Sequence, residues 1–348
     1  MKFDHKVLDI LSKAAEDVAP TREECKRLLA LGEATPEAFA VRAAAGAIVR
    51  GKNENAAYIY GQIGVEVEPC EANCSFCAFS KDYTGFGRVR MDDASIAQRT
   101  HEFTDGGDMF GLCVMTMHKY DKDFFLHAVD IARANAPSGT RIVSNIGDTD
   151  YEAFAEMKAA GLDSVYHVCR LGEGKYTKLD PKDRIRTMEN AKKAGLDLLD
   201  TLEPIGPEHG ADELLDNIFR TIEMECLVAG AMKRTPVPGT PFENTGSITD
   251  LRLAQILAIV ALAMLHLKRY PAILIHEPGP MGLVSGGNLI SAETGVNPRD
   301  TAADTAAGRG LDVDACRRML HEAGFTALCR GDDTKVALTP EYIEAARR

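Results

Sequence analysis

Residues 68–77 read Glu-Pro-Cys-Glu-Ala-Asn-Cys-Ser-Phe-Cys, which places Cys70, Cys74 and Cys77 at C-x3-C-x2-C spacing. Thiolates are the ligands that hold iron–sulfur clusters in proteins. Three of them on one loop can hold three irons of a [4Fe–4S] cube and leave the fourth iron open to a small molecule. The alternatives are ordinary buried cysteines or a zinc site, and zinc usually takes a fourth ligand from a second cysteine pair or a histidine nearby. The spacing therefore predicts an iron–sulfur loop with one open iron.

The composition is that of an ordinary globular chain, with 348 residues, 45% hydrophobic and 26% charged. The formal net charge is −12 and no basic stripe is present, which argues against a nucleic-acid partner. The most apolar run, Leu253 to Leu267, is too short to cross a membrane and predicts a buried helix. No apolar signal segment follows Met1. Nine cysteines, an odd number with three in a ligand motif, indicate a reduced cytoplasm, and an oxygen-labile cluster would suit an anaerobic host.

Strand-like and helix-like stretches alternate along the chain. Glycines such as Gly161 and Gly195 close helical stretches just before apolar runs, which is the usual punctuation between a helix and a strand. The predicted strands cover residues 56–67, 109–116, 141–146, 165–169, 196–205, 229–234, 272–276 and 288–292. Regular alternation favours a parallel sheet, and eight units favour a closed barrel. The predicted fold class is therefore α/β, a (β/α)8 TIM barrel with its active site at the carboxyl ends of the strands.

Two helical segments are expected outside the barrel. Residues 1–50 carry apolar residues at helical spacing, and Thr21 with Glu24 predicts a capped helix start. Near the C-terminus, Cys316, Met319 and Leu320 recur at helical spacing before a short polar tail. The predicted parts are residues 1–50, an N-terminal helical segment; 51–308, the barrel; and 309–348, a C-terminal helical segment packed on it.

The cysteine spacing, with Phe76 just before the last cysteine, resembles the signature of the radical S-adenosylmethionine (SAM) superfamily. The resemblance implies that SAM binds the open iron through its amino and carboxylate groups. One electron then cleaves SAM to methionine and a 5′-deoxyadenosyl radical, which abstracts hydrogen from a substrate. Several other stretches resemble the biotin-synthase-like group of that superfamily, which also contains a maturase of [FeFe]-hydrogenase and methylornithine synthase: residues 160–163, 184–189, 205–208, 239–241 and 286–288.

The same resemblance implies roles for five residues at a SAM site. Arg184 would pair with the SAM carboxylate, since an arginine fork matches a carboxylate; a surface helix arginine is the alternative. Glu173 would bind the SAM ribose, or else be a solvated loop carboxylate. Phe76 would lie beside the adenine, and so would Ile205 and Gly206. At 203, where the group's pattern has an apolar residue, this chain has a glutamate.

The cysteines inside the predicted barrel depart from the biotin synthase pattern. Biotin synthases of the well-known type hold a second cluster with three cysteines and one arginine, and only Cys113 has its counterpart here. The corresponding strands offer Ser144, Leu199 and Leu274, while Cys169 is new. Cys113 and Cys169 could ligate a different auxiliary cluster, with His276 and Glu277 as further ligands, or they could be small buried hydrophobes. We expect both thiols to close inward-facing strands.

These observations leave three hypotheses. The first, which the resemblance to biotin synthase favours, is a radical SAM enzyme that inserts sulfur into a small polar substrate, using an auxiliary iron–sulfur cluster. The second is a radical SAM lyase, mutase or metallocofactor maturase with no sulfur donor, and the third is a non-catalytic iron–sulfur carrier. The expected partners are the substrate and an electron donor such as flavodoxin or ferredoxin. Six residues are expected to give the lumen of the barrel a charged lining: His118, Lys119, His167, Arg170, Glu203 and His276. Such a lining favours a substrate with carboxylate or amine groups.

Overall fold

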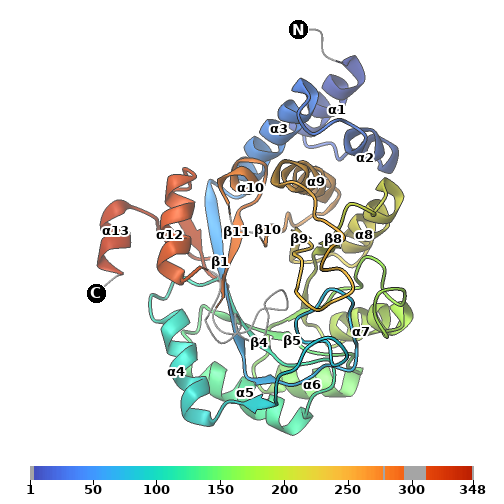
Figure 1. Cartoon of the computed structure of the whole chain (residues 1–348). Helices are drawn as coiled ribbons and strands as arrows, with labels where there is room; N and C mark the ends of the chain where they lie inside the picture. Colours follow the sequence, from blue (N-terminus) through green and yellow to red (C-terminus); the bar gives the residue numbers. More distant parts are fainter. Residues whose placement is uncertain (1–3, 277–278, 294–310, 347–348) are drawn as a thin grey trace.

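The computed structural model describes residues 4–276, 279–293 and 311–346. A closed ring of parallel strands forms the centre of the molecule, with helices between the strands (Figure 1). The barrel strands are β1 (Ala56–Gly64), β4 (Gly111–Met115), β5 (Arg141–Asn145), β6 (Ser164–Tyr166), β7 (Asp197–Leu199), β8 (Leu202–Ile205), β9 (Val228–Lys233), β10 (Ala272–Ile275) and β11 (Leu289–Glu293).

The barrel closes because β1 pairs in parallel with both β4 and β11. Strands β7 and β8 both pair with β9, so together they occupy one of the eight positions. The predicted TIM-like barrel is confirmed. Strand β4 illustrates the sequence pattern, since all five of its residues are buried, as expected for a parallel strand covered on both faces.

The helices that alternate with the barrel strands lie between the predicted strand ranges. They are α4 (Asp93–Thr104), α5 (Lys122–Asn135), α6 (Tyr151–Ala159), α7 (Pro181–Lys193), α8 (Ala211–Glu223), α9 (Asp250–Ala263), the short 3-10 helix η1 (Met264–His266) and α10 (Pro280–Val284). Gly161 and Gly195 have φ values of +100° and +75°, the left-handed conformation that ends a helix. Among the described residues, no helix is both long and apolar enough to span a membrane.

Helix α7 shows how the sequence brings one side chain into the site. Asp180 caps its N-terminus and Pro181 stands at the first helical position, where a missing N–H costs nothing. Arg184, Thr187, Met188 and Ala191 are buried at helical spacing and form its inner face. The face that packs on the barrel therefore contains an arginine one turn from the helix start.

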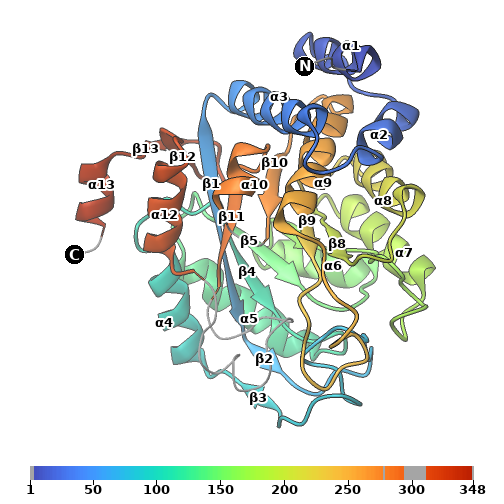
Figure 2. The ribbon, with the colours of Figure 1, turned by 45° about the horizontal axis from the view of Figure 1, so that its top comes forward.

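Three helices precede the barrel: α1 (His5–Ala15), α2 (Arg22–Leu29) and α3 (Pro36–Lys52). The predicted capping box is present, because Thr21 Oγ1 accepts from the Glu24 N–H and Glu24 Oε2 accepts from the Thr21 N–H at 2.8 Å. Helix α3 packs against α9, and α2 packs against α8 and α9. Figure 2 shows these helices at the opposite end of the barrel from the ribbon of β2 (Glu66–Val67) and β3 (Val89–Arg90).

The C-terminal segment is more structured than the sequence indicated. It contains α12 (Val313–Glu322), β12 (Ala327–Cys329), β13 (Lys335–Ala337) and α13 (Pro340–Ala345). The expectation of a short polar tail after the helix is wrong, because β12 pairs in parallel with the start of β1 and β13 pairs with β12. The boundary expected at residues 308–309 lies outside the described residues, and the division into three parts stays a prediction.

Candidate active site

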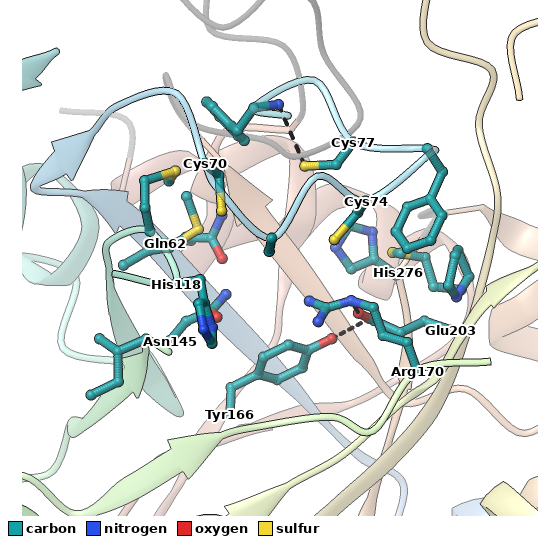
Figure 3. A pocket seen from close by; sticks show the side chains of 18 of the residues that line it. Gln62, Cys70, Cys74, Cys77, His118, Asn145, Tyr166, Arg170, Glu203 and His276 are labelled. Atoms are coloured by element: carbon teal, nitrogen blue, oxygen red, sulfur yellow. Dashed lines mark hydrogen bonds and ion pairs between the residues drawn. The ribbon is translucent and has the colours of Figure 1, made fainter. Parts of the chain in front are cut away.

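A cavity lies at the carboxyl ends of the barrel strands, under the loop that contains the three cysteines. Its empty space measures about 1230 Å³, the opening to solvent included. Figure 3 shows Cys70, Cys74 and Cys77 along one side and Tyr166, Arg170 and Glu203 on the opposite side. Residues from all eight barrel positions or the loops after them contribute to the lining, so the cavity is the expected site of a TIM barrel.

The cysteine loop is held by short-range contacts at both ends. The β2–β3 ribbon precedes and follows it, and the buried Glu66 carboxylate accepts hydrogen bonds from Arg88 and, at 2.8 Å, from Arg90 Nε. The Cys70 N–H donates to the Phe79 carbonyl at 2.7 Å. Asn73, with φ of +46°, turns the chain between the first two cysteines. These contacts direct all three cysteines into the same cavity.

The environment of the thiols fits an iron–sulfur cluster. Burial raises the pKa of Cys77 to about 12, and burial raises the pKa of Cys74 still further above its usual value. Such thiols stay protonated at neutral pH unless a metal takes the place of the proton. Within the described ranges, no three His, Cys, Asp or Glu side chains converge on a position for one metal ion. Because Cys70, Cys74 and Cys77 line one cavity at the spacing of a cluster loop, they are suited to hold three irons of one cube.

Arg184 is buried in the cavity wall and is not a surface residue. Its Nη1 donates to Asp148 Oδ1 at 2.9 Å and its Nε donates to the Val168 carbonyl at 3.1 Å. His167 Nε2 lies 3.3 Å from the same Asp148 oxygen. Burial, followed by Arg184, lowers the pKa of His167 to about 3, so this histidine is neutral. Burial opposes ionisation of Asp148, but His167 and Arg184 outweigh it and lower the pKa of Asp148 below its usual value.

Glu173 is also buried, so the expectation of a solvated loop carboxylate is wrong. Its Oε2 accepts from the Arg170 N–H at 3.0 Å, and its Oε1 accepts from the Thr177 hydroxyl at 2.6 Å. Arg184 Nε lies 3.6 Å from Glu173 Oε2. Glu173 does not line the cavity itself, but it lies directly behind two arginines that do.

A second charged group lies across the cavity from the cysteine loop. Arg170 Nε is 3.2 Å from Glu203 Oε1, and Glu203 Oε2 accepts from Tyr166 Oη and from Thr201 Oγ1, the latter at 2.7 Å. Burial disfavours a charge on Arg170, but Glu203 and Glu173 raise its pKa above the usual value. Neither Nη group of Arg170 makes a hydrogen bond within the part of the chain that the structure describes, so both are available to a ligand.

Three residues expected near adenine occupy different surroundings. Phe76 lines the cavity, and its ring lies nearly parallel to that of Phe242, with centroids 6.5 Å apart. Ile205, at the end of β8, packs into the hydrophobic core between strand and helices. Gly206 follows it and donates its N–H to His209 Nδ1. Neither Ile205 nor Gly206 lines the cavity. Arg234, which lies within contact distance of Gly206, does line it.

The two cysteines proposed for an auxiliary cluster do not share a cavity. Cys113 is buried on the barrel-facing side of β4, the same side as Met115, in a cluster with Tyr60 and Leu274. The expectation that Cys169 closes an inward strand is wrong, because β6 ends at Tyr166 and the Cys169 thiol lies 3.9 Å from the Pro181 carbonyl at the start of α7. An auxiliary cluster stays a prediction.

The remaining lumen residues are only partly as expected. His118 and His276 line the cavity, and His276 Nε2 lies 3.1 Å from Glu293 Oε1. Lys119 is exposed outside it, and His167 lies behind Asp148. Glu277, named as a further ligand, lies outside the described residues. Sequence reasoning missed four lining residues: Gln62, Asn145, Tyr166 and Arg234. Asn145 and Arg234 lie at the ends of predicted strands, where the barrel rule would have found them. Gln62 and Tyr166 lie inside their predicted strands, and only the observed strand ends place them at the cavity.

Comparison with known proteins identifies relatives in sequence and in fold. No family model matches the chain. A biotin synthase of Clostridioides difficile is 23% identical over 336 residues, covering 92% of this chain and 98% of the relative. A biotin synthase of Thermotoga neapolitana is 28% identical over 184 residues, covering 50% of this chain and 65% of the relative.

Two solved structures share the fold at low sequence identity. Methylornithine synthase (PylB) superposes with a TM-score of 0.77 at 17% identity, covering 91% of this chain and 96% of the other. HydG, a maturase of the [FeFe]-hydrogenase, superposes with a TM-score of 0.78 at 16% identity, covering 93% and 76%. With the cysteine spacing and the barrel, these comparisons relate the chain to the biotin-synthase-like group of radical SAM enzymes.

Proposed function

We propose that this chain holds a [4Fe–4S] cluster on Cys70, Cys74 and Cys77, binds SAM there, and abstracts hydrogen from a small polar substrate inside the barrel. The observation that carries the proposal is one cavity with three cysteines on one wall and the Arg170–Glu203 pair on the opposite wall. A substrate held between them would be enclosed by barrel side chains. Enclosure protects a reactive intermediate from side reactions.

Different residues of this chain are proposed to bind different parts of SAM. When bound, the cluster would pass one electron to SAM and yield methionine and a 5′-deoxyadenosyl radical. Arg184 would pair with the carboxylate of SAM, since its Nη2 makes no hydrogen bond within the described ranges. Phe76 would contact the adenine. Glu173 contacts Arg170 and Arg184 from behind the cavity wall. Its proposed role in binding the ribose rests on the family resemblance alone. The proposed contact of Ile205 and Gly206 with the adenine rests on the same resemblance.

Arg170 would anchor the substrate. Its Nε is paired with Glu203, while its two Nη groups point into a cavity whose other polar residues include Gln62, Asn145 and His118. An arginine with free Nη groups binds a carboxylate in a two-pronged manner. The substrate is therefore proposed to carry an anionic group that pairs with Arg170.

A second candidate function is sulfur insertion with an auxiliary cluster on Cys113 and Cys169. The names of the curated relatives, which are biotin synthases, favour it. The positions of the two thiols do not, because only Cys113 faces the barrel interior. Hydrogen abstraction without a sulfur donor, as in a lyase, mutase or metallocofactor maturase, needs only the first cluster and is better supported by the geometry. Either function needs an electron donor such as flavodoxin or ferredoxin.

Anaerobic reconstitution with iron and sulfide tests the proposal. The parent protein should bind about four irons per chain and release 5′-deoxyadenosine from SAM with dithionite as reductant. Its failure to cleave SAM under these conditions would show the proposal to be wrong. The Cys113→Ala, Cys169→Ala double variant separates the two functions. Equal iron in parent and variant supports the single-cluster enzyme, whereas lower iron with SAM cleavage intact supports the auxiliary cluster.

A further inference from the structure

Glu173 lies behind the wall of the cavity, next to the two arginines that are proposed to bind anions. Its side chain is 1% exposed and does not line the cavity. Its Oε2 accepts from the Arg170 N–H at 3.0 Å and lies 3.6 Å from Arg184 Nε. Its Oε1 accepts from the Thr177 hydroxyl at 2.6 Å. Both oxygens of the carboxylate therefore have partners inside the protein.

The loop between β6 and α7 is folded so that this carboxylate points back into the loop. Gly172 has a φ of +70°, and a Cβ at this position would lie 2.2 Å from the Tyr176 ring, so the fold of the loop requires glycine there. The Thr177 hydroxyl accepts from the Gly174 N–H at 3.1 Å, which leaves its own proton for Glu173. The loop itself thus fixes the position of the carboxylate.

The same loop is bound to the cysteine loop. The Lys178 N–H donates to the Ala72 carbonyl at 2.8 Å, and Leu179 packs against Ala72 and Cys74. Direct contacts therefore connect the buried carboxylate of Glu173 with the loop that is proposed to hold the cluster. A ligand bound at the cysteines and at the neighbouring arginines would lie on one side of this loop, with the carboxylate on the other.

Glu173 acts on two arginines that each have a carboxylate of their own. Arg184 Nη1 donates to Asp148 at 2.9 Å. Arg170 Nε lies 3.2 Å from Glu203. Burial and then Arg170 lower the pKa of Arg184, and Asp148 and Glu173 act in the opposite direction. Burial also disfavours a charge on Arg170, but Glu203 and then Glu173 raise its pKa above the usual value. Each arginine would keep one carboxylate if the charge of Glu173 were removed.

The other ends of both guanidinium groups are open to the cavity. Arg184 Nη2 and the two Nη groups of Arg170 have no hydrogen-bond partner among the described residues, and none of these three nitrogens is buried. A bound carboxylate would approach them from the cavity, while Glu173 acts on the same arginines from behind. Because like charges repel, the resident carboxylate opposes the binding of a second one.

We propose that Glu173 is a positioning residue whose buried charge limits how tightly Arg170 and Arg184 bind anions, and that it does not contact the SAM ribose. The proposal rests on the proposed function, because it needs the SAM carboxylate at Arg184. It assigns Glu173 a role different from the ribose contact that the family resemblance implies, since that contact would require a carboxylate oxygen to leave its partners inside the protein.

Glu173→Gln tests the proposal, because glutamine has the same shape and carries no charge. S-adenosylhomocysteine and its analogue without the carboxyl group are competed against labelled SAM on the anaerobically reconstituted holoprotein. The variant should bind S-adenosylhomocysteine about five- to fiftyfold more tightly than the parent, since one charge near the ligand carboxylate is gone. The analogue should not bind more tightly, because it has no carboxylate to be repelled.

A ribose contact predicts the opposite result. A glutamate that accepts hydrogen bonds from the ribose hydroxyls loses acceptor strength in Glu173→Gln, so both compounds would bind more weakly. Weaker binding of both compounds, or unchanged affinity for S-adenosylhomocysteine, would overturn the proposal. No binding of SAM to the parent would instead show the proposed function to be wrong.

Two further variants separate the loss of this charge from other effects. Thr177→Val removes a hydrogen bond to Glu173 but keeps the carboxylate, so it should not tighten the binding of S-adenosylhomocysteine. Tighter binding by Thr177→Val would assign the gain to a loosened loop and overturn the proposal. Asp108→Asn neutralises a fully buried carboxylate that pairs with Arg317 outside the cavity, and it should leave the affinity unchanged. A gain equal to that of Glu173→Gln would show a general effect of charge and overturn the proposal.

Discussion

Two arginines in this molecule are equally buried, but their surroundings shift their pKa values in opposite directions. Arg184 in the cavity wall and Arg317 on α12 are each 4% exposed. Arg317 binds both oxygens of the fully buried Asp108, at 2.7 and 2.9 Å, and Asp314 and the Tyr342 hydroxyl complete the group, here called the C-terminal clamp. Burial opposes a charge on Arg317, but Asp108 raises its pKa above the usual value.

The group around Arg184, here called the cavity cluster, is less well compensated. Burial and the nearby Arg170 lower the pKa of Arg184, although Asp148 and Glu173 act in the opposite direction. An arginine whose charge is under-compensated at a cavity wall gains from a bound anion, whereas one that is fully paired gains nothing. We therefore predict that the cavity cluster binds a ligand and that the C-terminal clamp stabilises the fold, and the following predictions test that distinction.

The largest effect is expected at the cysteine loop beside the cavity cluster. Cys74→Ala should abolish SAM cleavage, because each thiolate holds one iron and a cube held by two is not expected to bind SAM stably. The measurement is 5′-deoxyadenosine formed by the anaerobically reconstituted protein. Cys316→Ala, which removes a buried thiol of α12, is the control and should keep cleavage. Parent-level cleavage by Cys74→Ala would refute the assignment of the cluster.

The clamp should matter for stability and not for binding. Arg317→Met leaves the Asp108 carboxylate buried without its cation, which is expected to cost about 3–5 kcal/mol of unfolding free energy. Urea denaturation measures the loss, and the Asp108→Asn, Arg317→Met double variant should recover part of it. SAM affinity of the folded variant should equal that of the parent. A cost below about 1 kcal/mol would contradict the structural role of the clamp.

The cavity cluster should show the reverse behaviour. Arg184→Gln removes a charge-assisted hydrogen bond to the SAM carboxylate and should raise the dissociation constant of SAM about ten- to hundredfold. Arg186→Gln on the same helix is the control, because the Arg186 side chain is 63% exposed. Equilibrium dialysis measures both. An unchanged dissociation constant for Arg184→Gln would show that another cationic residue pairs with the SAM carboxylate.

The smallest effect concerns the pH dependence of stability. The pKa of His167 is about 3 in the folded state and about 6.5 when unfolded, so the unfolded chain takes up the proton first as the pH falls. Its contribution is fully present above pH 6.5 and is lost from there down to about pH 3. Between pH 7.5 and 5.5 the parent should lose about 1 kcal/mol more than His167→Asn in denaturation experiments. Equal losses would show that His167 is protonated in the fold.

The barrel and the cysteine loop were readable from the sequence because their signals are local. A short apolar run bounded by a glycine or polar residues indicates a strand, and eight such runs in alternation with helices leave few other topologies. The spacing of Cys70, Cys74 and Cys77 likewise needs no partner elsewhere in the chain. The position of Arg184 one turn inside α7 follows from its helical period with Met188.

Tertiary structure alone decided which side chains meet. Cys169 was expected in the lumen because the strand was extended three residues too far, and leaving the strand removes the alternation that decides which face a side chain takes. The Arg170–Glu203 pair and the pairing of β12 with β1 join residues far apart in the chain. The sequence by itself determined the barrel elements and the cysteine loop; the closure of the barrel decided which side chains lie opposite that loop, because only closure brings the ends of different strands together.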